Sequence, residues 1–138
     1  MKNERIKLIA YWITTILGPA SFVIGGILHI THAEQVVGTL NHLGYPTYFA
    51  TILGVWKLLG AIAIVAPGLP LLKEWAYAGF FFDLTGAAAS HAFSGDPFFA
   101  AGPHMIAAPL VFLALVIASW ALRPPSRRLV SANSGGMA

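Results

Sequence analysis

The sequence predicts an all-α fold, a polytopic membrane bundle of four helices with both termini in the cytoplasm. Of its 138 residues, 57% are hydrophobic and only 9% are charged, whereas soluble proteins carry about 25% charged residues. Four apolar segments are each long enough to cross a hydrocarbon layer of about 30 Å as a helix. The alternation of apolar and polar residues that is typical of strands is absent.

The first apolar segment covers residues 8–30 and follows a basic start that contains Lys2, Arg5 and Lys7. A cleaved signal peptide has the same order of charge and hydrophobicity, but its apolar core has only about 7 to 15 residues, fewer than this segment. We therefore interpret residues 8–30 as the first membrane span.

The remaining spans are predicted from apolar runs between turn-forming residues. Gly, Pro, Asn and Asp, which favour turns, are frequent in the connections 41-NHLGYP-46, 67-PGLP-70 and 94-SGDP-97. The second, third and fourth spans cover residues 47–66, 75–93 and 105–122. All four spans form one domain, residues 1–123. The Pro-, Ser- and Gly-rich residues 124–138 are predicted to be a disordered cytoplasmic tail.

The positions of Lys and Arg predict the orientation of the chain in a bacterial inner membrane. Basic residues precede the first segment, occur in the second connection as Lys73, and follow the last segment as Arg123, Arg127 and Arg128. The first and third connections contain no Lys or Arg, so the positive-inside rule places them outside. The net charge of +3 does not indicate a nucleic-acid partner, because the charges lie at segment ends and not in one continuous patch.

Lys57 and Asp83 are predicted to form an ion pair inside the bundle. Each lies about ten residues from the 67-PGLP-70 turn, so the rise of about 1.5 Å per residue puts both near the middle of the bilayer. A lone charge at this depth costs at least ~2.5 kcal/mol and therefore finds a partner. The pair either fixes the register of the helices and does nothing else, or forms the polar floor of a pocket or a proton-handling pair.

Small residues recur at helical spacing around these two charges. The second segment has the stripe Ala50, Gly54, Lys57, Gly60, Ala61 and Ile64, and the third has Ala76, Gly79, Asp83, Gly86, Ala87, Ser90 and His91. Small residues allow helix backbones to approach closely. We therefore expect the second and third segments to pack tightly, which would bring the ion pair into contact.

Histidines gather at the end of the bundle that is predicted to face outward. They are His29, His32, His91 and His104, with His42 and Glu34 in the outer connection. They can cap helix ends, hydrogen-bond a polar ligand such as a quinone carbonyl, or hold a metal or haem, which the weak H-x-x-H spacing disfavours. Trp56 lies beside Lys57 and either packs or lines a site for a flat ligand. Cysteine is absent, which excludes disulfides and thiolate chemistry.

The run 73-KEWAYAGFFFDLTGAAASH-91, with Lys57 and Gly60 before it and prolines in the intervening turn, resembles the DoxX-like family of small four-span membrane proteins. The similar layout extends to Leu122. The resemblance implies that Lys57, Asp83, Ser90 and His91 belong to the polar signature of the family. The wider group is associated with quinone-linked oxidoreductase systems and oxidative-stress complexes, but it implies no catalytic residues.

The sequence thus leads to the hypothesis of an accessory or quinone-interacting subunit that serves a membrane or periplasmic redox partner. The candidate ligand-binding residues are Trp56, Lys57, Asp83, Ser90, His91, His29 and His104. The alternative is a structural or assembly protein whose ion pair only fixes helix packing. A small-molecule or proton carrier is disfavoured because no inverted repeat is clear. Catalytic activity, ligand identity and oligomeric state stay open.

Overall fold

The protein is described by a computed structural model in which residues 1–129 are placed, and this part of the chain is all-α, as predicted. The six α-helices are α1 (Lys2–Leu17), α2 (Phe22–Ile30), α3 (Glu34–Leu43), α4 (Tyr48–Val65), α5 (Pro70–Phe93) and α6 (Ala107–Ala121). Two short 3-10 segments are η1 (Pro19–Ser21) and η2 (Pro125–Arg127). Most of the predicted tail, residues 130–138, lies outside the described residues.

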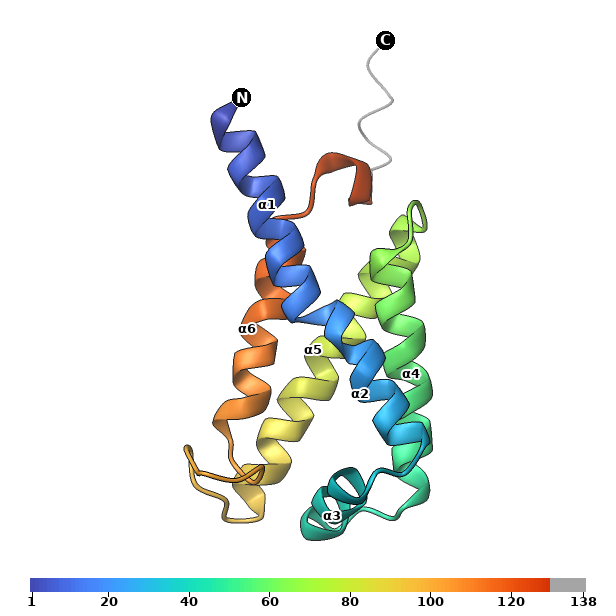
Figure 1. Ribbon diagram of the computed structural model, residues 1–138, viewed down its shortest axis with the longest axis vertical. Helices are drawn as coiled ribbons and strands as arrows, with labels where there is room; N and C mark the ends of the chain where they lie inside the picture. Colours follow the sequence, from blue (N-terminus) through green and yellow to red (C-terminus); the bar gives the residue numbers. More distant parts are fainter. Residues whose placement is uncertain (130–138) are drawn as a thin grey trace.

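The first predicted segment forms two helices and not one. Pro19 has no N–H to donate and restricts the residue before it, so the helix ends at Leu17. Gly18 lies at the break, where a Cβ would come within 2.9 Å of the Leu115 Cβ. Figure 1 shows the chain changing direction between α1 and α2. Residues 8–30 are therefore a bent pair of helices.

The other segments form helices close to the expected bounds, with two differences. α5 begins at Pro70 and not at residue 75, because proline suits the first turn of a helix. Lys73 is consequently part of α5 and is buried. The outer connection also contains α3, which the sequence analysis did not predict.

The helices expose apolar faces. Lys2–Ile30 and Tyr48–Val65 are each long and apolar enough to cross a membrane, and Ala107–Ala121 is a shorter apolar helix. Large apolar side chains are widely exposed, for example Ile24 at 66% and Phe82 at 70%. Apolar surface of this extent is unusual on a soluble monomer and indicates contact with lipid or with another apolar surface.

The closest approach between helices joins α2 to α4. A Cβ at Gly26 would lie 2.9 Å from the carbonyl oxygen of Gly54, and a Cβ at Gly54 would lie 2.8 Å from that of Gly26. Gly79 and Gly86 on α5 have nothing within 4 Å of such a Cβ. We expected the second and third segments to pack tightly on each other, and this prediction is wrong. α4 packs tightly on α2 instead, while Gly79 and Gly86 in the small stripe of α5 border open space.

An aromatic core joins these helices to α5 and α6. The rings of Phe22 and Phe80 are stacked with 4.7 Å between their centroids. Nearby, the Ser119 hydroxyl lies 2.6 Å from that of Thr15 and 2.7 Å from that of Tyr77. These buried hydroxyls connect α1, α5 and α6 and satisfy one another, which removes the cost of burying them.

Basic side chains fasten the end of the molecule where α4 turns into α5. The last carbonyls of a helix have no partner within it. The ammonium group of Lys73 donates to the carbonyls of Ala63 and Ala66, and Arg127 donates to the Ile64 carbonyl at 3.0 Å. α4 and α5 are thus held together at this end. Figure 1 shows α5 running from there towards the foot of α6, away from α4.

We expect Gly54→Ala to destabilise the protein by about 1–3 kcal/mol, the usual cost of overpacking, because its Cβ would meet the backbone of α2. Gly79→Ala is the matched control, since it adds a methyl group to open space and improves helix propensity. Thermal unfolding in detergent should give a lower melting temperature only for Gly54→Ala. Equal melting temperatures for the two variants would contradict the close approach of α2 and α4.

Candidate functional site

A groove of about 830 Å³ lies between α4 and α5. Its walls are mostly aliphatic and aromatic, and the side chains of Trp56, Phe82 and Trp75 stand on its rim with large exposed surfaces. The groove forms because α5 presents small residues here, such as Gly79, which leave the space beside α4 unfilled. The space can accept a flat or elongated apolar molecule.

Lys57 and Asp83 form the polar floor of this groove, and His29 contacts Lys57 from α2. Lys57 Nζ lies 3.8 Å from Asp83 Oδ2 and 3.2 Å from His29 Nε2. The Lys57 and Asp83 side chains are 14% and 22% exposed. The three residues come from α4, α5 and α2 and meet because α2 packs so closely on α4.

The hydrogen bonds assign the protonation of the His29 ring. His29 Nδ1 lies 2.7 Å from the Gly25 carbonyl oxygen, which can only accept, so Nδ1 carries the proton. In the neutral imidazole Nε2 is then an acceptor and takes a hydrogen bond from the Lys57 ammonium. An ammonium has three donors. One serves His29 and one faces Asp83, which leaves a donor for an oxygen atom in the groove.

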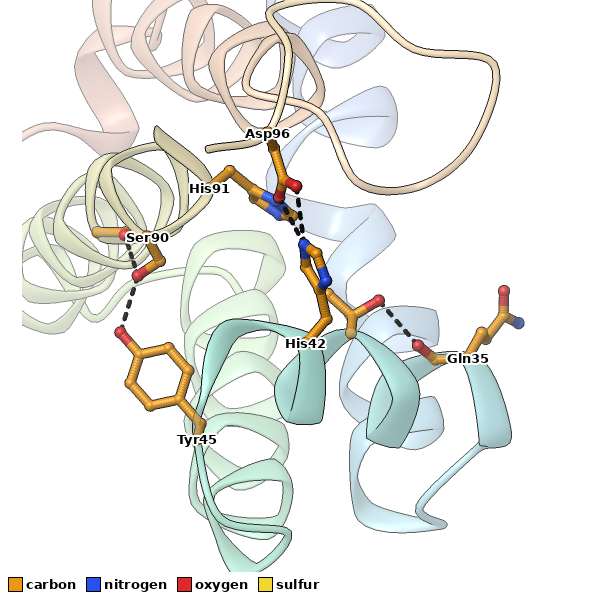
Figure 2. Close-up of polar contacts among 8 residues, drawn as sticks. Gln35, His42, Tyr45, Ser90, His91 and Asp96 are labelled. Atoms are coloured by element: carbon orange, nitrogen blue, oxygen red, sulfur yellow. Dashed lines mark hydrogen bonds and ion pairs between the residues drawn. The ribbon is translucent and has the colours of Figure 1, made fainter. Parts of the chain in front are cut away.

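A second polar cluster, the outer cluster, lies at the far end of α5 and contains Asp96, His42, His91 and His104. The Asp96 carboxylate accepts hydrogen bonds from His91 Nδ1 at 2.6 Å and from His42 Nε2 at 2.8 Å (Figure 2). The His104 ring stacks on His42 with 3.9 Å between the ring centroids. Asp96 therefore joins α3 to the end of α5.

A hydroxyl pair next to the outer cluster bridges the same helices. The Tyr45 hydroxyl, just after α3, lies 2.8 Å from Ser90 Oγ on α5, as Figure 2 shows. Both residues line the groove. The polar groups of the groove thus lie at two levels, the ion pair deeper and the hydroxyls at the outer end.

The histidines that the sequence suggested as ligand-binding or metal-ligating residues do not all lie in one site. His29 contacts Lys57, and His32 Nε2 lies 2.8 Å from the Thr51 hydroxyl. His91 and His104 both belong to the outer cluster, where their ring centroids are 6.4 Å apart. Within residues 1–129, no three His, Asp or Glu side chains are arranged to hold a metal ion. Trp56 lies on the rim of the groove.

Asp96 and Tyr45 are the residues that sequence reasoning missed. Asp96 was interpreted as a turn former in 94-SGDP-97, and nothing in local spacing pairs it with His42, which lies 54 positions away. Its place five positions after His91 was the one available signal. Tyr45 was treated as part of the turn-forming connection 41-NHLGYP-46, and its contact with Ser90 joins residues 45 positions apart.

Replacing one member of the ion pair should cost more stability than replacing both. Asp83→Asn leaves the Lys57 ammonium without its counter-charge, so we expect a loss of about 1–3 kcal/mol. Lys57→Met/Asp83→Leu should recover most of that loss, because apolar side chains replace both charges. Unfolding of the wild type, Asp83→Asn, the single variants Lys57→Met and Asp83→Leu, and the double variant in one detergent tests this. Additive effects of the single substitutions would mean that the two side chains do not interact.

The hydrogen bond from His91 lowers the pKa of Asp96 below its ordinary value of 3.8. The carboxylate therefore stabilises the folded state above pH 3.8, and this contribution is lost as the pH falls through the lower folded-state pKa. Carbon NMR of a labelled Asp96 carboxyl should show a midpoint below 3.8, which His91→Phe should raise. A midpoint that His91→Phe leaves in place would contradict this cause.

Comparison with known proteins identifies the family of this chain. The sequence profile of the DoxX-like family matches residues 13–119, which include both polar clusters. No curated protein and no solved structure matches the chain. The family and the exposed apolar helices together indicate a membrane protein that contacts the lipid bilayer. Because the match covers most of the sequence and confirms the resemblance seen there, the chain belongs to the DoxX-like family.

Proposed function

We propose that this protein spans the bacterial inner membrane four times and binds a quinone-type molecule in the groove between α4 and α5, as an accessory subunit of a membrane redox system. The observation that carries the proposal is the charge-balanced floor of Lys57 and Asp83 inside an otherwise apolar groove. The ligand would enter from the bilayer.

The distribution of charge supports four spans with both termini in the cytoplasm. The basic residues Lys73, Arg123 and Arg127 lie at the end of the molecule where α4 joins α5, which is also the end of the N-terminus and η2 (Figure 1). Positive charge marks the cytoplasmic side. The 18 residues of α4 would span about 27 Å, close to the thickness of the hydrocarbon layer.

The chemistry of the groove supports a neutral ligand that carries a carbonyl group. The free donor of Lys57 can bind a carbonyl oxygen, while the apolar walls accept a ring and a hydrocarbon tail. An anionic head group would meet the Asp83 carboxylate close to the same ammonium, and like charges repel at this distance. A quinone meets these requirements better than a fatty acid does.

The proposal includes a redox partner because a quinone changes its oxidation state only by exchanging electrons with another group. The sequence has no cysteine, so thiol chemistry is not available. A bound quinone supplies redox chemistry of its own when it takes up electrons and protons to become the quinol. The protein would position the head group, and a membrane or periplasmic partner would deliver or remove the electrons.

A structural or assembly role is the second candidate, and the ion pair is the observation that favours it. Lys57 and Asp83 join α4 to α5 at one depth and would fix the register of these helices without any ligand. In that case the groove would hold only lipid chains. The two roles differ in whether a defined molecule remains bound to the purified protein.

The first test is purification in a mild detergent, followed by mass spectrometry of the extracted small molecules. Quinone in a molar ratio close to one supports the proposal. The optical spectrum and a metal analysis of the same sample detect a haem or a metal, which would overturn the assignment to quinone. A well-folded protein with no defined ligand would favour the structural role.

Filling the groove, or removing its hydrogen-bond donor, should weaken quinone binding. Gly79→Phe adds a ring to the open space beside Gly79, and Lys57→Met removes the donor for the carbonyl. Ala89→Phe is the control, since Ala89 is exposed on α5 and does not line the groove. In a titration with a fluorescent quinone analogue, we expect at least about tenfold weaker binding for the first two variants, the effect of about 1.4 kcal/mol. Wild-type affinity in Gly79→Phe would exclude this groove.

A further inference from the structure

α3 covers the outer end of the groove. Its residues Leu40 and Leu43 line the groove together with Tyr45, and Leu40 is only 6% exposed. The opposite side of α3 is polar and exposed, with Gln35 and Asn41. In Figure 1 the helix lies at the end of the molecule where α4 and α5 are far apart. α3 therefore separates the apolar groove from the outer aqueous phase.

Side-chain contacts tie α3 to the opposite wall of the groove. His42 donates to Asp96, the His42 ring stacks on His104, and the Tyr45 hydroxyl bonds Ser90. All of these partners lie on α5 or in the connection between α5 and α6. Figure 2 shows both hydrogen bonds reaching across from the α3 side. We call the His42–Asp96 and Tyr45–Ser90 hydrogen bonds the latch.

The latch is weaker than the contacts that hold the groove at its inner end. His42 and Tyr45 are both exposed, so water competes for the hydrogen bonds that their side chains make. At the inner end, by contrast, Lys73 is 1% exposed and donates to two carbonyls of α4. Local opening should therefore begin at α3.

The residues at both ends of α3 have backbone conformations suited to a hinge. His32, before the helix, has φ of 53°, a left-handed conformation that is uncommon for a residue other than glycine. Gly44, after the helix, has φ of 87° and open space around it. Because His32 Nε2 also contacts the Thr51 hydroxyl, Gly44 is the end at which the chain can bend while the hydrogen bonds of α3 stay intact.

We propose that α3 is a lid that opens and closes the outer mouth of the groove, and that the His42–Asp96 and Tyr45–Ser90 hydrogen bonds hold it shut. The lid controls whether polar molecules from the outer aqueous phase reach the Lys57–Asp83 floor. It rests on the proposed function for the membrane topology and for the identity of the ligand that it encloses.

The absence of cysteine allows a direct test, because a single introduced thiol is the only one in the chain. Ala87→Cys places the reporter on the α5 wall of the groove, one turn below His91. The protein is reconstituted in lipid nanodiscs. The rate of labelling by a charged, water-soluble thiol reagent then measures how often the mouth is open.

The latch is broken by His42→Phe/Tyr45→Phe, which removes both hydrogen bonds and keeps both aromatic rings. We expect the Ala87→Cys thiol to react about tenfold faster in this background, because two hydrogen bonds no longer oppose opening. Ser94→Ala, at an exposed position that makes no side-chain hydrogen bond, should leave the rate unchanged. An unchanged rate in the latch variant would overturn the lid.

A second reporter separates lid opening from general loosening. Ala63→Cys lies at the inner end of the same groove, and its labelling rate should stay within about twofold when the latch is broken. An equal increase at both reporters would also overturn the lid. Neither measurement needs a ligand, so failure to find a quinone would refute the proposed function while leaving this result intact.

Discussion

The charge of Lys57 within an apolar group of helices is the constraint on which the rest of the structure depends. An ammonium there must be compensated, and Asp83 and His29 supply the counter-charge and the acceptor from two other helices. To bring His29 within reach, α2 must lie almost against α4, which only glycine at positions 26 and 54 permits. The side of α4 that faces α5 is then free to form a groove.

The sequence was informative where a physical rule acts over a short distance. Hydrophobic length located the helices, and equal distance from one turn matched Lys57 with Asp83. The same reasoning misassigned the small stripe of α5. Spacing shows that Gly79 and Gly86 share a face, but whether that face meets a helix or open space depends on where the bulky Phe22 and Phe80 rings fit, which is a property of the assembled core.

The outer end was predicted least well, because its contacts join residues far apart in the chain. α3 is short, and its last residues are followed by the turn formers of 41-NHLGYP-46, so that segment was interpreted as a connection. The Asp96 carboxylate can accept hydrogen bonds from both His42 and His91 only when α3 folds back over the end of α5. The break at Pro19, in contrast, could have been predicted from the proline, but residues 8–30 were interpreted from their apolar length alone.

Lys57 and its two partners, His29 and Asp83, are not equally fixed in place. His29 and Lys57 belong to helices joined backbone to backbone, so their separation is fixed, whereas Asp83 lies on the wall across the groove. Any molecule that pushes α5 outward must therefore lengthen the distance between Asp83 and Lys57 and weaken their attraction, which varies inversely with distance. A molecule that widens the groove would therefore leave the charges of Lys57 and Asp83 less compensated by each other and more available to the bound molecule itself.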